Sequence, residues 1–226
     1  RIDPYLLPNP FDVVSRMGDQ LVSGVAWRYL APTLSAALLG SGIAVLIAMP
    51  LSFVIVHSRL LGSVLEPFVA VSQTIPLVAI APLLVLWIGY GTVPIAVLCA
   101  IVAFFPMITT AIVGLRQLDM RVVESALLDG AGPWQRIWHI ETPIAAPAML
   151  AGVRGGVVLS MTGAVVGEFV MGGSGLGTLL TLSRDATDIV GVFAVVAWIS
   201  ASALVLYGSI YAAERAAVIA LQGEDT

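Results

Sequence analysis

The sequence contains no lysine, one cysteine and two histidines, and only 11% of its 226 residues are charged. All ten basic residues are arginines and they form no basic stripe, which argues against a nucleic-acid-binding protein. Cys99 cannot form a disulfide within the chain and lies in an apolar run, so we predict a buried thiol. No set of histidine, cysteine and carboxylate residues has metal-ligand spacing, so no metal site is predicted.

Apolar residues, in contrast, make up 59% of the chain, and its mean hydropathy is +1.01. An ordinary soluble domain is about 25% charged, and a soluble core could not hide this much apolar surface. The solvent of the chain must therefore be lipid. Because a membrane demands internally satisfied backbone groups, we predict an all-α polytopic membrane protein.

Five runs are long enough to cross the hydrocarbon core, which needs about 20 apolar residues. They are residues 30–56, 64–88, 93–115, 144–170 and 189–213. Prolines interrupt the second and third runs, and glycines are frequent in the fourth. Such residues are tolerated where neighbouring helices or a cavity satisfy the backbone, so we predict five transmembrane helices in close contact, with pore lining as the alternative role of the small residues.

The placement of the arginines predicts the orientation, because cytoplasmic loops carry an excess of basic residues. Six of the ten fall at the end of the spans that carries the central polar loop: Arg59, Arg116, Arg121, Arg136, Arg154 and Arg215. The sequence thus predicts a cytoplasmic loop at 116–143, an outside amino end and an inside carboxyl end. Because the chain starts with arginine rather than methionine, we also expect a sixth helix before residue 1.

Residues 1–28 then form an extracytoplasmic segment, and residues 29–226 form the transmembrane domain. Apolar spacing across 11–25 predicts an interfacial helix in the first of these. The glycine-rich run 172–177 also lies outside and lacks the Gly-Lys-Ser/Thr of a phosphate loop. We interpret it as a turn into a short re-entrant helix at 178–184.

The central polar loop is the most informative stretch of the chain. Good helix formers over 121–129 end at Gly130, a natural helix stop, and Pro133 can begin a second helix. One face of that helix is apolar and aromatic, with Trp134, Ile137 and Trp138. A short helix pair with an aromatic face and a charged rim is typical of a protein-docking surface. The alternatives are a headgroup belt for the tryptophans and a solvated charge for Glu124.

This loop reads Glu-x-Ala-x-x-x-Gly, then nine residues, then Ile-x-x-Pro, at Glu124, Ala126, Gly130, Ile140 and Pro143. It resembles the coupling-loop signature of ABC importer permeases of the binding-protein-dependent type. Ser125 and Thr142 stand where the family commonly has alanine and leucine. The runs Pro-Asn-Pro at 8–10, Gln-Thr-Ile-Pro at 73–76, 81–91 and Gly-Leu-Gly at 175–177 resemble its nitrate, sulfonate and taurine branch, which includes permeases for thiamine-pyrimidine precursors and riboflavin.

The resemblance implies a type I ABC importer permease fold in the bacterial inner membrane. Two permease chains, identical or different, form the pathway, cytoplasmic ATPases dock on their central loops, and an extracytoplasmic binding protein delivers solute. The chain itself is expected to bind no cofactor and to perform no bond chemistry, with ATP and Mg²⁺ held by the ATPases. The docking residues that it implies are Glu124, Ser125, Ala126, Asp129, Gly130, Trp134, Ile137, Trp138, Ile140 and Pro143.

Polar or adaptable side chains inside the spans are candidates for the solute pathway: Gln73, Thr74, Ser160, Met161, Thr162 and Glu168. Each is also open to a plain helix–helix contact. Glu168 stands near the outer end of the fourth run. It is either a gating residue at a mouth that water reaches or an end-of-helix surface charge. Glu66 lies near Arg59 at the inner surface, where a salt bridge between the two is the simple expectation.

Two other classes of function fit the sequence less well. A membrane-embedded enzyme would need a nucleophile–base pair or metal ligands at membrane depth, and a secondary transporter would show internal repeats with paired broken helices. Neither pattern is clear. The solute stays open between a neutral heterocycle, such as a thiamine-pyrimidine precursor or riboflavin-like compound, and a nitrate-, sulfonate- or taurine-type anion. The shortage of arginine at span centres, Arg154 excepted, favours the heterocycle.

Overall fold

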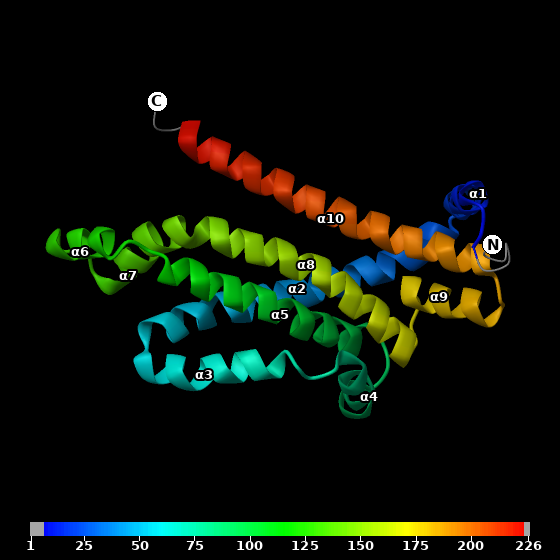
Figure 1. The fold of residues 1–226 in the computed structure, drawn as a ribbon, viewed down its shortest axis with the longest axis horizontal. Helices are drawn as coiled ribbons and strands as arrows, with labels where there is room; N and C mark the ends of the chain where they lie inside the picture. The colour runs from blue at the N-terminus through cyan, green and yellow to red at the C-terminus, as the bar shows by residue number, and fades with distance from the viewer. Residues whose placement is uncertain (1–6, 224–226) are drawn as a thin grey trace.

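The computed structural model describes residues 7–223, and all regular structure in that range is helical (Figure 1). The helices are α1 (Pro10–Val22), α2 (Val25–His57), α3 (Arg59–Ser72), α4 (Leu77–Ile88), α5 (Thr92–Arg116), α6 (Met120–Leu128), α7 (Pro133–Arg136), the π-helical turn η1 (Ile137–Glu141), α8 (Thr142–Met171), α9 (Leu176–Asp185) and α10 (Ile189–Gly223).

Four helical runs of the described range are long and apolar enough to cross a membrane: α2, α5, α10 and the run Pro133–Met171 that ends in α8. The predicted spans at 30–56, 93–115, 144–170 and 189–213 are therefore confirmed as helices. α10 continues beyond the predicted end at 213 to Gly223. The sixth helix before residue 1 stays a prediction.

The second predicted span, 64–88, is not one helix, which corrects the sequence-based prediction. α3 and α4 meet at an angle of 100° across residues 73–76. Pro76 causes the break, because proline has no N–H to donate and disfavours a helical conformation at Ile75 before it. Pro76 itself has φ −68° and ψ 120° at the start of α4. The described chain thus has four spans, or five if this bent pair counts as one.

α5 lies at the centre of the bundle, packed along both α2 and α8 (Figure 1). Small residues permit the close approach, since a Cβ on Gly40 of α2 would overlap Cys99 of α5, and one on Gly156 of α8 would lie 2.5 Å from Met107 Cε. Cys99 is fully buried, as predicted. Close packing holds these helices together, because lipid is as apolar as their side chains and gives them no hydrophobic drive to associate.

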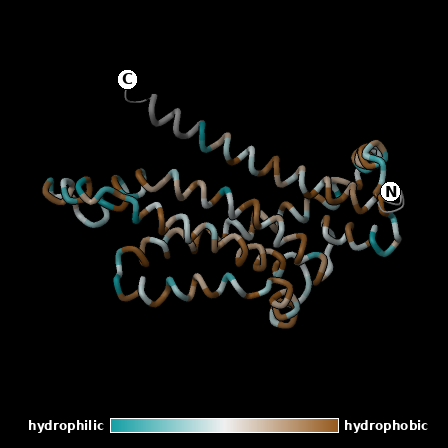
Figure 2. The backbone as a smooth tube through the Cα atoms, viewed as in Figure 1, coloured by the Kyte–Doolittle hydropathy of each residue, from teal (hydrophilic) through white to brown (hydrophobic). Residues whose placement is uncertain are grey.

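Hydrophilic residues gather at the two ends of the bundle (Figure 2). One end, which we call the docking end, carries α6 and α7, and the other, the α9 end, carries α1 and α9 (Figure 1). α1 confirms the helix predicted near 11–25, although its place in a membrane interface stays a prediction. An ion pair at 2.5 Å joins Arg16 to Asp188, the residue before α10, and Trp198 Nε1 of α10 donates a hydrogen bond to Gln20 at 3.1 Å.

At the α9 end, the buried carboxylate of Glu168 joins three helices. Thr33 of α2 donates its hydroxyl to Oε1 at 2.8 Å, and the Gly177 N–H at the start of α9 donates to Oε2 at 2.7 Å. The Leu176 N–H in turn donates to Thr33 Oγ1 at 2.8 Å. Glu168 is only 2% exposed, so the alternative of an end-of-helix surface charge is wrong, whereas the gating role stays a prediction. Hydrogen bonds from an α9 amide and from Thr33 satisfy the carboxylate instead.

The glycine-rich run before α9 owes its composition to this close approach. A Cβ on Gly175 would overlap both Glu168 Oε1 and Thr33 Oγ1, whereas one on Gly173 would meet its nearest neighbours at 3.5 Å, an ordinary contact. The run is therefore a packed turn into α9. α9 confirms the short helix predicted at 178–184 but begins earlier, at Leu176.

We predict that Gly175→Ala destabilises the protein by about 1–3 kcal/mol, the usual cost of overpacking a filled site. Gly173→Ala is the matched control and should melt within about 0.5 kcal/mol of the parent. Thermal unfolding of the purified protein in detergent measures both. Equal melting of the two variants would contradict the packing role assigned to Gly175.

Candidate functional site

The docking end is built on α6, a short helix with a defined start and stop. Asp119 begins it by accepting a hydrogen bond from the Arg121 N–H at 2.9 Å. Gly130 ends it in the left-handed region, with φ +83°, and the Ala131 N–H reaches back to the Ala126 carbonyl at 3.0 Å. This is the Schellman stop that glycine favours. The predicted helix–glycine–helix arrangement is therefore confirmed.

α6 buries only one of its side chains, Val123, against the rest of the protein. Its other large apolar residues stand in the open, with Leu128 89%, Met120 64% and Leu127 50% exposed. Glu124 and Asp129 are exposed on the same short helix and at its end. An exposed apolar patch with a charged rim at the end of a membrane bundle is what a partner protein covers.

The second helix of the docking end is continuous with the fourth predicted span, 144–170. α7, η1 and α8 form one run from Pro133 to Met171. The π-turn η1 stands directly before Pro143 and ends with the Thr142 N–H bonded to the Ile137 carbonyl. Pro143 is tolerated because it lies in the first turn of α8. Docking end and membrane span thus share one continuous helical rod, and such π-turns are frequent at functional sites.

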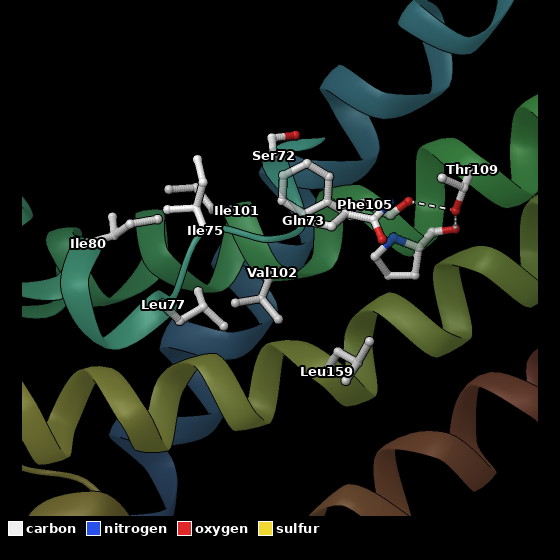
Figure 3. Close-up of a pocket in the computed structure, with 11 residues that line it drawn as sticks. Ser72, Gln73, Ile75, Leu77, Ile80, Ile101, Val102, Phe105, Thr109 and Leu159 are labelled. Carbon is white, nitrogen blue, oxygen red and sulfur yellow. Dashed lines mark hydrogen bonds between the residues drawn. The ribbon is translucent and has the colours of Figure 1, made fainter. Parts of the chain in front are cut away.

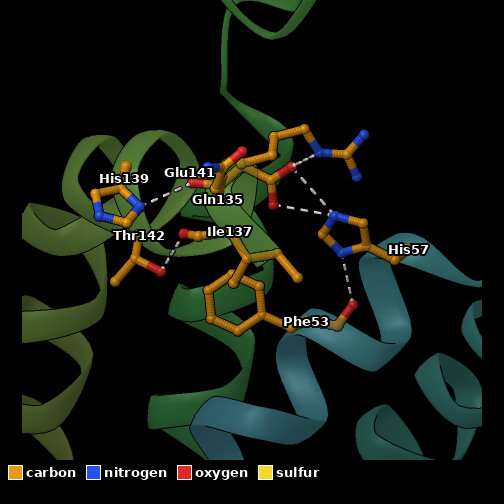
Figure 4. A network of polar contacts seen from close by, with 8 residues as sticks. Phe53, His57, Gln135, Ile137, His139, Glu141 and Thr142 are labelled. Carbon is orange, nitrogen blue, oxygen red and sulfur yellow. Dashed lines mark hydrogen bonds and ion pairs between the residues drawn. The ribbon is translucent and has the colours of Figure 1, made fainter. Parts of the chain in front are cut away.

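A polar network that the sequence reading missed lies under this rod (Figure 4). Glu141 of η1 is 4% exposed and pairs with His57 Nε2 at 3.0 Å and with Arg136 Nε at 2.7 Å. His57 is the last residue of α2, and its Nδ1 faces the Phe53 carbonyl at 2.9 Å. The sequence signal for this network was Glu141, which directly precedes α8. Its partner His57 could not be identified from the sequence because it lies 84 residues away.

The predicted docking residues fall on two faces of this end. Glu124, Ser125, Asp129 and Gly130 are exposed, and Ala126 is half-buried, on or beside α6. The aromatic stripe turns toward α2 instead, where Trp134, Ile137 and Trp138 line an apolar groove of about 540 Å³ with Phe53 and His57. Ile140 is half-buried and Pro143 exposed on the rod. The structure therefore brings the α6 residues together and sets the stripe apart from them.

A pocket of about 380 Å³ lies at the bend between α3 and α4 and is lined on its other sides by α5 and α8 (Figure 3). Gln73, a predicted pathway residue, lines it, next to Phe105 and Thr109. The Thr109 hydroxyl donates to the Phe105 carbonyl at 2.8 Å, which leaves its oxygen free to accept. No charged side chain lines this pocket.

The other pathway candidates are scattered. Ser160 is buried and donates to the Ala37 carbonyl of α2 at 3.1 Å. This is the helix–helix contact that the sequence offered as the alternative to a pathway role. Met161 is buried in the core, and Thr162 is exposed on α8. Thr74 is exposed in the bend and bonds its own chain at Val71. Only Gln73 of the six lines the pocket at the bend.

Comparison with known proteins agrees with this architecture. The family described as "Binding-protein-dependent transport system inner membrane component" matches residues 27–218. The riboflavin transport system permease protein RibX of Chloroflexus aurantiacus is 39% identical over 90% of this chain and 76% of its own length. The formylaminopyrimidine transport permease protein ThiX of Halalkalibacterium halodurans is 31% identical over 84% of this chain and 76% of its own.

The chain belongs to this family. It is the permease component of an ABC importer, an integral protein of the inner membrane. Among solved structures, a chain of the inward-facing MetNI methionine ABC transporter has a TM-score of 0.75, with 16% identity, and the match covers 84% of this chain and 94% of that one. This likeness shows that the permease has the type I ABC importer fold.

Two further charged pairs link helices of the permease. Glu66 of α3 pairs with Arg116, the last residue of α5, rather than with Arg59. Arg154 pairs with Glu214 of α10 at 3.1 Å and lies over the rings of Tyr207 and Tyr211. In the part of the chain that the structure describes, no group of histidine, cysteine or acidic residues could hold a metal ion.

We predict that Gly130→Val loosens α6, since a branched side chain at φ +83° is strongly disfavoured. Gly132→Val is the control, because Gly132 has an extended backbone, with φ −69° and ψ 164°. Hydrogen exchange of the α6 amides should rise by about tenfold in the first variant and stay near the parent in the second. A Gly130→Val permease with parental exchange in α6 would show that the stop does not depend on glycine.

Proposed function

We propose that α6 and the turn after it form the surface on which an ABC ATPase docks, with ATP and Mg²⁺ bound by that partner. One observation carries the proposal, namely the exposed apolar residues of α6 on a helix that projects from the end of the bundle. Leu128 at 89% exposure has no role in folding that would explain its position. The continuous rod through η1 gives a mechanical connection from this surface to the membrane.

The proposed orientation follows from the same surface. The docking end faces the cytoplasm, where ATP is available, and α1 and α9 face outward toward a solute-binding protein. A second permease chain, identical or different, completes the pathway. Exposed apolar residues on α3 and α4, among them Phe68 and Leu86, leave room for lipid or for that second chain.

The proposed solute is a neutral heterocycle of the riboflavin or thiamine-pyrimidine type. The pocket at the α3–α4 bend supports this choice, because it offers an amide at Gln73, a hydroxyl at Thr109 and an aromatic ring at Phe105, with no charge. Arg154, the one arginine that could have served an anion inside a span, is already paired with Glu214. RibX and ThiX are named for riboflavin and formylaminopyrimidine, which are compounds of this chemical class.

We predict that Leu128→Asp prevents the ATPase from co-purifying with the permease, since a carboxylate would be placed in an apolar contact. Val22→Asp is the control, because Val22 is 91% exposed on α1 at the opposite end. The yield of ATPase per permease should fall about tenfold in the first variant and stay unchanged in the second. Docking elsewhere on the permease is indicated if Leu128→Asp retains its ATPase.

We predict that Gln73→Leu lowers solute uptake about tenfold by removing a hydrogen-bonding partner of the solute. Thr74→Val is the control, since Thr74 adjoins Gln73 but does not line the pocket. Uptake of labelled riboflavin and of formylaminopyrimidine into proteoliposomes that contain the whole importer measures the effect. Competition by taurine as strong as that by unlabelled riboflavin would refute the neutral-heterocycle assignment.

We predict that a cysteine at Ser23 reacts with a membrane-impermeant maleimide added to intact cells, whereas one at Asp129 reacts only after permeabilisation. Both positions are exposed, at opposite ends of the bundle. The buried Cys99 is replaced by alanine in both variants to remove background. Labelling of the Asp129→Cys permease in intact cells would invert the proposed orientation.

A further inference from the structure

The helical rod Pro133–Met171 carries two buried carboxylates, one near each end. Glu141 is 4% exposed at the docking end, and Glu168 is 2% exposed at the α9 end. They stand 27 residues apart, which is roughly 40 Å along a helix. Buried carboxylates are costly in a membrane protein and face partners inside it, so each needs a partner of its own.

Both partners come from the same helix, α2. Glu141 binds His57, the last residue of α2, at 3.0 Å, and Glu168 accepts from Thr33, two turns into α2, at 2.8 Å. Between these two contacts α2 and the rod both pack along α5 and also contact each other. The two helices are thus fastened to one another near both ends by polar contacts and between them by apolar packing.

The contact at the docking end joins an imidazole and a carboxyl group. The His57 Nδ1 must donate its hydrogen to the Phe53 carbonyl, because a carbonyl only accepts. With Nδ1 donating to Phe53, a hydrogen bond between Nε2 and the Glu141 carboxyl group needs one further proton, which the two groups share. Arg136 flanks the same carboxylate from α7 at 2.7 Å. Glu141 therefore ties α2 to the segment that follows the docking helix.

The contact at the α9 end continues beyond Glu168. The same carboxylate holds the Gly177 N–H, and Thr33 holds the Leu176 N–H, so the first turn of α9 is bonded to both α2 and the rod. Any rotation of the rod about its axis changes these bonds directly. A displacement at α6 and α7 consequently has a continuous route to α9 through two helices that are bonded to each other near both ends.

We propose that Glu141 and Glu168 are positioning residues that make α2 and the rod a single rigid lever, through which nucleotide binding at the docking end moves α9. The inference rests on the proposed docking of an ATPase at α6. It predicts that loss of either contact uncouples the two ends while leaving the ATPase bound. It further predicts that the two losses are not additive, since one broken fastening already frees the lever.

The experiment uses the whole importer with a Ser174→Cys label site in the exposed turn before α9, in a Cys99→Ala background. The labelling rate by an impermeant maleimide is compared without nucleotide and with ATP and vanadate. Glu141→Gln tests one contact. Thr33→Val tests the other without altering Glu168, and Thr33→Ser, which keeps the hydroxyl, is its matched control.

The ATP-dependent change in labelling should shrink about fivefold or more in Glu141→Gln and in Thr33→Val, which is the lower range of allosteric coupling. Thr33→Ser should keep the parental change, and the double variant should be no worse than the worse single one. Additive losses, a parental response in either single variant, or a parent importer whose labelling ignores ATP would each overturn the lever. Failure of the ATPase to co-purify with the unmodified permease would instead remove the proposed docking function.

Discussion

Close approach of helices along α5 is the constraint on which the rest of this permease depends. In lipid, apolar side chains gain nothing by leaving the solvent, so helices associate through close packing and a few polar contacts. The glycines and alanines where α2 and α8 meet α5 allow that packing, and a Cβ at several of the glycines would overlap the neighbouring helix. Large apolar side chains are then left to cover the outside, where Phe68, Leu86 and Leu204 are more than 70% exposed.

The polar groups of the chain form contacts at the two ends of the bundle and, inside it, between helices. Ion pairs link elements at the two ends, as in Arg16–Asp188 and Arg136–Glu141. Inside the bundle, Ser160 and Glu168 bond across helices instead of facing lipid. Prolines before and after α5 in the sequence have different effects. Pro76 separates α3 from α4, whereas Pro143 and Pro147 lie within the continuous rod.

Much of this was predictable from the sequence, because hydropathy and helix stops are local signals. Apolar runs located four spans, and Gly130 and Pro133 located the helix pair of the docking end. Two of the wrong predictions depended on partners far away in the chain. The surroundings of Glu168 depend on Thr33, 135 residues earlier. Glu66 likewise pairs with Arg116, 50 residues away in the sequence, rather than with the nearby Arg59. Sequence spacing contains no information on such pairings.

The length of α10 has a consequence for the space around the docking end. Its 35 residues extend roughly 52 Å at 1.5 Å per residue, against a hydrocarbon core of about 30 Å. Even at the steepest tilt usual for membrane helices, about 40°, the core takes up only some 26 residues. Roughly nine residues must therefore stand clear of the hydrocarbon core, and α10 has its carboxyl end on the same side as α6 (Figure 1). Whatever part of α10 projects at that end limits the directions from which a large protein can approach α6.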